Sequence, residues 1–353
     1  MHKAANRKYS ASAPLKVLRL GNPVYAQSAW AKLTADYPIT VTSTNSTKRS
    51  EFIEELKAGK YLDVGYITRT FESCKQTGLF DIELLDLIKE YTKVEAISHN
   101  GAGYDQVDAT KCAELNIQVS NVPTAVDNAT ADTAVYLVLG ALRNFQYSTE
   151  RMKAGAWPST KCAGADVGHD PDGKVLGILG MGGIGRTIRD RLEPFGFKGI
   201  AYHNRKQLSD DLAKGAEYCA TPDELYKRAD VICVSVPLNK ATKHMINEKA
   251  FESMKDGVII VNTARGPIVD ESALKKALQS GKVGAFAADV WENEPNVDME
   301  LIAMRNVTCL PHMGTFTVET MKKMEEFVVK NVETFVETGD VLSLVSECSS
   351  LRK

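Results

Sequence analysis

The sequence predicts an α/β protein with two doubly wound parallel sheets. Short runs rich in β-branched residues alternate with helix-like stretches along most of the chain, which is typical of parallel sheets covered by helices on both faces. The runs fall into two sets with one long helical pattern between them. The chain has 353 residues, more than one compact core usually holds, so we expect two domains.

The first set contains four predicted strands. Polar helical patterns over Ile82–Tyr91 and Asp105–Leu115 lie between them and would cover the sheet. The strands are Lys16–Leu20, Val64–Thr68, Val94–Ser98 and Ile117–Asn121.

The second set follows a long helical pattern over Asn128–Asn144 and a segment rich in Gly, Pro and Asp over Trp157–Gly173, which predicts a loop or linker. Helical stretches separate its strands, as a doubly wound sheet requires. The six predicted strands are Val175–Leu179, Gly199–Tyr202, Val231–Val236, Val258–Val261, Ala285–Asp289 and Val307–Leu310.

A last helical pattern runs over Val318–Thr338. We expect this helix to return to the first sheet, which would make the first domain discontinuous. The expected domains are then residues 1–125 with 318–353, and residues 126–317.

Composition excludes several classes of protein. There are 43 Lys and Arg against 45 Asp and Glu, so nothing indicates nucleic acid or an acidic membrane as a partner. No apolar run approaches the roughly 20 residues of a membrane helix. Seven cysteines without CxxC pairs favour reduced thiols, and six histidines without an HExxH pattern give no reason to expect a metal site.

The N-terminal segment Met1–Pro14 is basic and contains serines, a faint likeness to a mitochondrial presequence. It lacks a clear amphipathic stripe, so we interpret it as a disordered tail. The expected location is cytoplasmic, with a mitochondrial location as the alternative.

The segment Gly180–Gly185 is a GxGxxG motif between the predicted strand Val175–Leu179 and a predicted helix, Ile184–Leu192. Gly180 would permit the tight turn, Gly182 a close approach of backbone to a pyrophosphate, and Gly185 close packing of helix on strand. The start of the helix would offer N–H donors to the phosphates. The motif therefore predicts a dinucleotide-binding (Rossmann) domain, with Gly180, Gly182, Gly183, Ile184 and Gly185 against the cofactor.

The next strand ends in Asn204 and Arg205, where an NAD-binding site would carry an acid for the ribose hydroxyls. An acid would repel a 2′-phosphate, whereas Asn204 and Arg205 would donate hydrogen bonds to it. We therefore predict NADPH as the preferred cofactor, with NADH as the alternative. A plain solvated turn at Arg205 is the competing interpretation.

Three further segments lie just past predicted strand ends in the second domain, where open α/β sheets bind ligands. Together with the glycine motif, they resemble the D-isomer-specific 2-hydroxyacid dehydrogenase family from Lys16 to about Leu344, and fungal glyoxylate or 2-oxoacid reductases and D-mandelate dehydrogenases in several details. The three segments are Asn262–Gly266, Asp289–Pro295 and Leu310–Gly314; further matches are His99–Asp105, Asn121–Pro123, Ala129–Asp132 and Val236–Pro237.

The resemblance implies a flavodoxin-like substrate domain, a Rossmann cofactor domain and a catalytic triad of Arg265, Glu294 and His312. His312 would give a proton to the carbonyl oxygen of a 2-oxo acid, because imidazole titrates near neutral pH. Glu294 would orient its ring, with Glu292 as the alternative partner, and Arg265 would hold the substrate carboxylate. The expected reaction is reduction of glyoxylate, hydroxypyruvate or a bulkier 2-oxo acid to a D-2-hydroxy acid.

The resemblance also implies supporting positions. The backbone of Ala102 and Gly103 would bind the substrate carboxylate. Apart from the resemblance, we expect first-domain loops with Arg69 and Phe71, and the turn Met313–Phe316, to line the remaining pocket. A turn at Gly101–Gly103 without a ligand and a purely structural network at Asp289 remain open. The further cofactor contacts implied are Val236, Pro237, Thr263, Ala264, Asp289 and Gly314.

The small-residue helix Ala129–Leu142 corresponds to the family's dimer region, so we expect a homodimer; an internal core helix is the alternative. Two other functions compete. A formate dehydrogenase would pair its histidine with Gln rather than Glu294, and a corepressor-like, cofactor-sensing protein would keep the triad without needing turnover.

Overall fold

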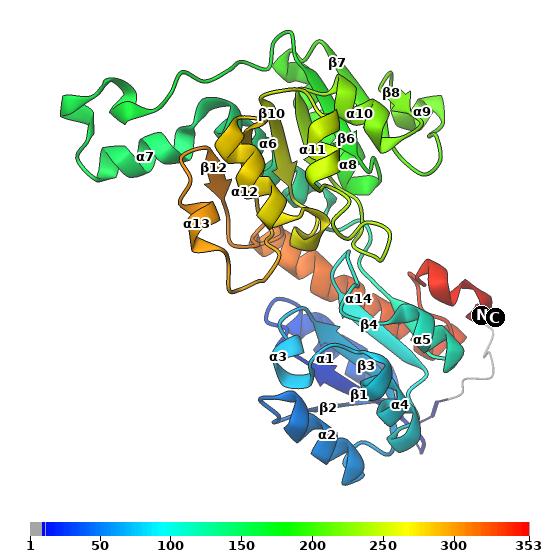
Figure 1. The fold of residues 1–353 in the computed structure, drawn as a ribbon. Coiled ribbons are helices and arrows are strands. Elements are labelled where there is room, and N and C mark those ends of the chain that lie inside the picture. The colour runs from blue at the N-terminus through cyan, green and yellow to red at the C-terminus, as the bar shows by residue number, and fades with distance from the viewer. Residues whose placement is uncertain (1–8, 11, 353) are drawn as a thin grey trace. The chain divides into compact units, whose positions relative to one another are not determined.

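The computed structural model describes residues 9–10 and 12–352, and the chain divides into two compact units (Figure 1). Unit 1 comprises Met1–Val126 and Thr317–Lys353, and unit 2 comprises Asp127–Phe316. Each unit carries its own parallel sheet, of five and seven strands. The predicted fold class is confirmed.

The sheet of unit 1 has the strand order β2-β1-β3-β4-β5, with every pair parallel. This 2-1-3-4-5 order is the flavodoxin-like arrangement. The prediction missed β2, an edge strand with two threonines and little burial. The strands are β1 (Leu15–Leu20), β2 (Ile39–Ser43), β3 (Val64–Thr70), β4 (Ala96–Asn100) and β5 (Gln118–Ser120).

Helices cover both faces of this sheet. On one face α1 and α14 pack through Trp30, Val332 and Phe335, so the last helix does return to the first sheet. The other face is covered mainly by α2, α4 and α5. The helices are α1 (Gln27–Asp36), α2 (Arg49–Lys57), α3 (Cys74–Thr77), α4 (Ile82–Tyr91), α5 (Ala109–Glu114) and α14 (Val318–Thr338), followed by a 3-10 helix, η5 (Ser346–Leu351).

Helix α5 is shorter than the predicted helix over Asp105–Leu115. The carboxylate of Asp108 accepts a hydrogen bond from the Lys111 N–H and caps the helix, so the helix begins at Ala109. The residues before Asp108 form a loop at the carboxyl end of β4 instead.

The sheet of unit 2 has the order β12-β11-β10-β9-β6-β7-β8, again all parallel. Strand order reverses between β6 and β9, the switch point where such sheets bind dinucleotides. The prediction missed β8, a three-residue edge strand. The strands are β6 (Val175–Leu179), β7 (Gly199–His203), β8 (Glu217–Cys219), β9 (Val231–Val234), β10 (Val258–Asn262), β11 (Val283–Ala288) and β12 (Val307–Cys309).

The predicted long helix is α6 (Asp127–Arg143), which packs with α8 (Gly183–Leu192) on one face of this sheet. The predicted linker Trp157–Gly173 contains only short 3-10 turns, η1 (Trp157–Ser159) and η2 (Lys161–Gly164). The remaining helices are α7 (Phe145–Lys153), α9 (Asp210–Ala213), α10 (Pro222–Arg228), α11 (Glu248–Ser253), α12 (Glu271–Ser280) and α13 (Met299–Ile302), with η3 (Glu193–Phe195) and η4 (Gly266–Ile268).

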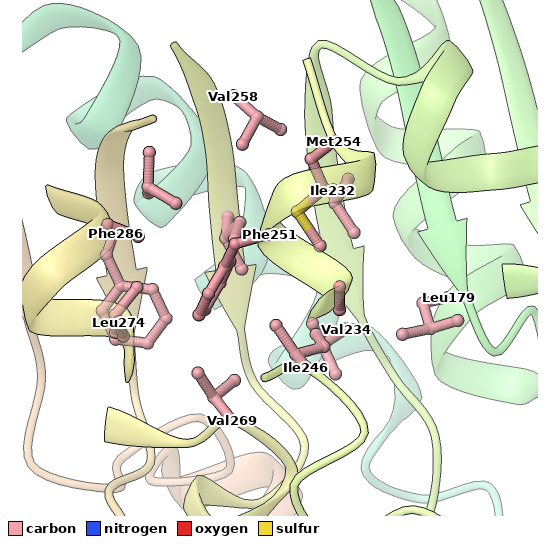
Figure 2. Close-up of a cluster of buried hydrophobic side chains, with 14 of the residues drawn as sticks. Leu179, Ile232, Val234, Ile246, Phe251, Met254, Val258, Val269, Leu274 and Phe286 are labelled. Carbon is pink, nitrogen blue, oxygen red and sulfur yellow. The ribbon is translucent and has the colours of Figure 1, made fainter. Parts of the chain in front are cut away.

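The other face of the seven-stranded sheet carries the core drawn in Figure 2. Phe251 and Leu274 come from α11 and α12 and pack among strand residues such as Ile232 and Phe286. Each such buried side chain stabilises the fold by about 1.5–3 kcal/mol relative to an exposed one. This core fixes β9, β10 and β11, whose carboxyl ends carry the candidate site.

Residues 1–8 and 11 of the expected disordered tail lie outside the described part of the chain. Tyr9, by contrast, packs beside Phe335, with ring centroids 6.4 Å apart, so this end of the segment is ordered.

All seven cysteines are free thiols. Among the described residues, no helix is long and apolar enough to cross a membrane, and no group of three or more His, Cys, Asp or Glu could hold a metal ion.

Candidate active site

The glycine motif forms the turn between β6 and α8. Gly180 has φ +96°, and a Cβ there would lie 2.7 Å from Val236 Cγ1; on Gly185 it would lie 2.4 Å from the Gly180 carbonyl oxygen. Both positions therefore require glycine for the turn and for helix-to-strand packing. Nothing lies within 4 Å of where a Cβ on Gly182 would be, so the backbone is open there to an approaching ligand.

Asn204 supports this turn directly. Its Oδ1 accepts a hydrogen bond from the Met181 N–H at 2.7 Å, and its Nδ2 donates weakly to the Met181 carbonyl at 3.4 Å. Arg205 next to it is exposed. The predicted pair thus divides into a residue that braces the glycine turn and a cation that faces solvent.

Sequence reasoning missed Asp127, which lies against the start of α8. A Cβ on Gly183 would lie 2.4 Å from Asp127 Oδ2. Burial raises the pKa of Asp127, with the nearby Arg186 acting in the opposite direction. No sequence signal points to this contact, because the two residues are 56 positions apart on different helices.

The structure brings His312 and Glu294 together. His312 Nδ1 lies 2.6 Å from Glu294 Oε2, and the other carboxylate oxygen, Oε1, accepts a hydrogen bond from the Trp291 N–H at 2.7 Å. The Trp291 indole donates to the Leu310 carbonyl at 2.9 Å, which ties the two loops together. His312 has φ +57°, a conformation that non-glycine residues adopt at a cost and that is common at functional sites.

Arg265 lies in the loop that follows β10. The side chain of Asn262 shapes this loop, because its Nδ2 donates to the Arg265 carbonyl at 2.9 Å and its Oδ1 accepts from the Ala264 N–H at 3.0 Å. The guanidinium donates to the Ala264 carbonyl at 2.7 Å. Since β10, β11 and β12 are neighbours, Arg265, Glu294 and His312 all lie at the same carboxyl edge of the sheet.

Asp289 follows β11 and is 2% exposed. Its Oδ1 accepts from the Met313 N–H and its Oδ2 from the Gly314 N–H, both at 2.7 Å. Burial raises the pKa of Asp289, which these two hydrogen bonds oppose. Both carboxylate oxygens thus fix the backbone directly after His312, so the structural network considered for Asp289 is present.

Glu292, the alternative partner considered for His312, instead contacts His244. The His244 Nε2 lies 2.6 Å from Glu292 Oε1, while the Glu292 N–H donates to Glu271 Oε1 at 2.7 Å. The His244 N–H donates to the Pro267 carbonyl at 2.8 Å, two residues after Arg265. Sequence reasoning missed His244 and Glu271, which connect the loop of Arg265 with the loop of Glu294.

The other predicted cofactor positions also lie at this edge. Val236 and Pro237 follow β9, because that strand ends at Val234, and Thr263 and Ala264 follow β10. Gly314 lies in the loop after β12. In unit 1, Ala102 and Gly103 lie in the loop after β4, where the Ala102 carbonyl accepts from the Asn121 side chain at 2.7 Å.

The fold and this edge define the class of protein as a dinucleotide-binding oxidoreductase with a histidine–carboxylate pair. Comparison with known proteins supports this class. Residues 135–314 match the model described as "D-isomer specific 2-hydroxyacid dehydrogenase, NAD binding domain". Glyoxylate reductase 1 of Saccharomyces cerevisiae is 48% identical over 334 residues, which cover 94% of each chain.

Solved structures give the same result. A glyoxylate reductase from Paecilomyes thermophila has a TM-score of 0.89 and 44% identity, covering 95% of this chain and 99% of its own. An NADPH-dependent glyoxylate/hydroxypyruvate reductase from Sinorhizobium meliloti, in complex with NADP and malonate, has a TM-score of 0.80 and 27% identity, covering 95% and 97%. The chain belongs to the D-isomer specific 2-hydroxyacid dehydrogenase family, which confirms the resemblance drawn from the motifs.

Proposed function

We propose that this protein reduces 2-oxo acids to D-2-hydroxy acids, with NADPH as the preferred reductant. The observation that carries the proposal is the His312–Glu294 pair, which lies with Arg265 at the carboxyl edge of a sheet that also bears the glycine turn. In this proposal unit 2 binds the dinucleotide and unit 1 binds the substrate.

The glycine turn fits a dinucleotide. The open backbone at Gly182 and the N-terminal N–H groups of α8 would hold the pyrophosphate, with Gly183, Ile184 and Gly185 completing the turn. When bound, the nicotinamide supplies the hydride that reduces the carbonyl carbon. Val236, Pro237, Thr263, Ala264, Asp289 and Gly314 are the further positions proposed to line this cofactor.

His312 is the proposed proton donor. Glu294 binds Nδ1, so the ring is held in one orientation, and Nε2 is the ring atom that we propose gives its proton to the substrate carbonyl oxygen. The negative charge of Glu294 stabilises the protonated imidazole before the proton is given up. Arg265 holds the substrate carboxylate through its donor fork and stabilises the charge that develops on the carbonyl oxygen.

The proposed substrates are glyoxylate, hydroxypyruvate and bulkier 2-oxo acids, which share the carboxylate–carbonyl group that Arg265 and His312 would recognise. The names of the similar proteins support the first two. A panel of 2-oxo acids with NADPH, with chiral analysis of the product, tests the proposal. Absence of turnover with every 2-oxo acid would refute it and favour a corepressor-like role, whereas formate oxidation would favour the formate dehydrogenase alternative.

The preference for NADPH rests on the absence of an acid after β7. We expect Asn204→Asp to shift the ratio of kcat/KM for NADPH over NADH by about tenfold or more towards NADH, because a carboxylate accepts from ribose hydroxyls and repels the 2′-phosphate. Asp keeps the oxygen that accepts from the Met181 N–H, so the glycine turn survives. Arg205→Ala should weaken NADPH alone. A wild-type enzyme that turns over faster with NADH than with equal, low NADPH would refute the preference.

We also propose a homodimer. Helix α6 buries eight residues inside unit 2, so it is a core helix and offers only an outer face such as Tyr136. Helix α7 buries none, and Figure 1 shows it and the following segment extending from the sheet of unit 2. Trp157 is 62% and Val167 96% exposed in that segment. A dimer would cover these apolar side chains.

Sedimentation at micromolar concentration tests this, with Trp157→Lys and Val167→Lys as the variants expected to dissociate the dimer. A monomeric wild type would refute it. A cytoplasmic location is proposed on the seven free cysteines, which suit a reducing compartment; a tagged chain found in mitochondria would refute that.

A further inference from the structure

A buried cation lies beneath the loop proposed to receive the substrate carboxylate. Arg69 is on β3, opposite His99 on the neighbouring strand β4, and it is 1% exposed. We expected Arg69 in a loop that lines the substrate pocket, but the structure places it within β3 and buries it. Neither the predicted triad nor the predicted cofactor site includes this residue.

Arg69 is a buried charge, and its partners satisfy its guanidinium only in part. Its Nη1 lies 3.2 Å from His99 Nδ1, its Nη2 donates to Gln106 Oε1 at 2.7 Å, and its guanidinium carbon lies 5.1 Å from the centre of the Phe80 ring. Among the residues that the structure describes, Arg69 Nε has no hydrogen-bond partner, and no acidic side chain forms an ion pair with the guanidinium. Burial lowers the pKa of Arg69 to about 10, against smaller opposing effects of Cys74 and Asp105, so the side chain is still a cation at neutral pH.

The contact with Arg69 fixes the state of His99. A guanidinium has only donors, so His99 Nδ1 must accept the hydrogen bond. The ring is therefore neutral there and carries its proton on Nε2. The contact thus selects one of the two tautomers and turns an N–H donor towards the opposite side of the ring.

The protonated Nε2 lies directly beneath the loop. A Cβ on Gly101 would lie 2.9 Å from His99 Nε2 and 3.5 Å from the Gly103 carbonyl oxygen, so only glycine leaves room for the ring. The carbonyls of Gly101 and Ala102 are held from the other side by the Val122 N–H at 2.9 Å and the Asn121 side chain at 2.7 Å. The loop is thus held between His99 and the segment after β5.

We propose that Arg69 and His99 are positioning residues that hold the Gly101–Gly103 loop and give it the positive potential that attracts the substrate carboxylate. The inference rests on the function proposed above. An isolated buried cation destabilises a fold unless something offsets its desolvation. An anion bound at the adjacent loop would offset it, so this charge serves affinity for the substrate rather than stability.

If this assignment is right, one variant, Arg69→Met, should weaken substrate binding without lowering the stability of the fold. Arg69→Met replaces the cation with an apolar side chain of similar length. We expect the Tm to hold or rise, while the KM for glyoxylate and the Kd of the non-reducible analogue oxamate rise about tenfold. The kcat should stay within about threefold, because a group that binds ground and transition states alike changes KM alone. The Kd of NADPH, which unit 2 would bind, should not change.

His99 offers a matched pair of variants. His99→Leu removes the donor beneath the loop and should raise the same two constants about tenfold. His99→Gln places an amide N–H near the former Nε2 position and should stay within about threefold of the wild type. Should Arg69→Met not fold, Gly101→Ala, whose Cβ would press on the His99 ring, must raise the KM and the oxamate Kd with kcat retained.

Oxamate binding to the cofactor-saturated protein, measured by calorimetry, keeps this test apart from that of the proposed function. A wild type without turnover would refute the proposed function, yet the oxamate Kd would still report on the loop. Folded Arg69→Met and His99→Leu proteins with an unchanged KM and oxamate Kd would overturn the inference, as would a Tm loss of many degrees in Arg69→Met with no change in binding.

Discussion

The carboxyl edges of the two sheets differ in how their ionisable side chains are partnered. In unit 2, His312 and His244 each contact a glutamate at 2.6 Å, so base and acid hold each other in place. In unit 1, Arg69 is buried with neutral partners and an unsatisfied Nε. The comparison indicates two kinds of site: paired charges fix geometry for chemistry, whereas a cation without an anion is left for a ligand to complement.

The two histidines of unit 2 share a second property. His244 has φ +50° and His312 φ +57°, and the glutamates they contact lie two residues apart in one loop. Left-handed backbone at a non-glycine residue costs of order 1 kcal/mol or more and persists only where the surroundings impose it. The repeated combination indicates that the loops of Arg265, Glu294 and His312 are held as one assembly, which the following variants test from the largest expected effect to the smallest.

The largest effect should come from His312. We expect His312→Asn to lower kcat/KM for glyoxylate by about 10³-fold, because no side chain then gives a proton to the carbonyl oxygen. Asn tolerates left-handed backbone, so this variant keeps the turn that an alanine would strain. Steady-state kinetics measure the loss of kcat/KM. His169→Asn, a variant of an exposed histidine, is the control. A folded variant with wild-type activity would remove the proton-donor role.

Glu294→Gln should lower kcat/KM by about 10²-fold. The amide can still accept from the Trp291 N–H, so the loop is retained. It no longer stabilises a protonated imidazole, and an amide N–H that donates to His312 Nδ1 leaves a neutral ring whose Nε2–H is a much weaker acid. Glu300→Gln, exposed on α13, is the matched control. Equal rates for both variants would show that the charge of Glu294 does not matter.

The long elements of the fold were predictable from the sequence. Helices α4 and α14 match the predicted bounds, as does β6, because each has a strong period or a continuous apolar run. The edge strands β2 and β8 were missed because they are short and only partly buried, so their residues lack that apolar signal. The glycine turn was predictable because a single local turn sets the spacing of its glycines.

The side-chain pairs were harder to predict. The family resemblance placed Glu294 and His312 near each other, but nothing local assigns Glu292 to His244, 48 positions away, or Arg69 to His99. These contacts depend on which strands become neighbours and which way each side chain points. Asp289 shows the same limit, since only the structure shows that both its oxygens hold the backbone after His312.

A smaller effect should follow from His244. We expect His244→Asn to lower kcat about fivefold to tenfold, since Asn keeps the left-handed backbone but is too short to reach Glu292. His244→Gln keeps the reach and should recover part of the loss. Measuring kcat and KM separately distinguishes His244 from the unit 1 residues, because His244 variants should lower kcat whereas unit 1 variants should raise KM. A loss confined to the KM for the 2-oxo acid would contradict the assignment of His244 to the catalytic loops.

The smallest effect should come from a carboxylate of unit 1 that is fully partnered. Glu55 loses some solvation by burial, but hydrogen bonds from Lys60, Thr44, Tyr61 and Ser46 outweigh this and lower its pKa from 4.5 to about 2. Because the folded pKa is depressed, the stability is present above about pH 4.5 and is lost as the pH falls towards 2. The side chain is partly exposed, so we expect Glu55→Gln to cost only about 1 kcal/mol near neutral pH.

Thermal unfolding of Glu55→Gln between pH 7 and pH 2.5 tests this against Glu54→Gln, its exposed neighbour. The Tm difference between wild type and Glu55→Gln should shrink as the solution is acidified, while Glu54→Gln should track the wild type throughout. Neither variant should change the KM for glyoxylate, because a charge with four partners has nothing left to offer a ligand. A raised KM in Glu55→Gln would break the distinction between paired and unpaired charge in unit 1, since it would show that partnered charges there also act on the substrate.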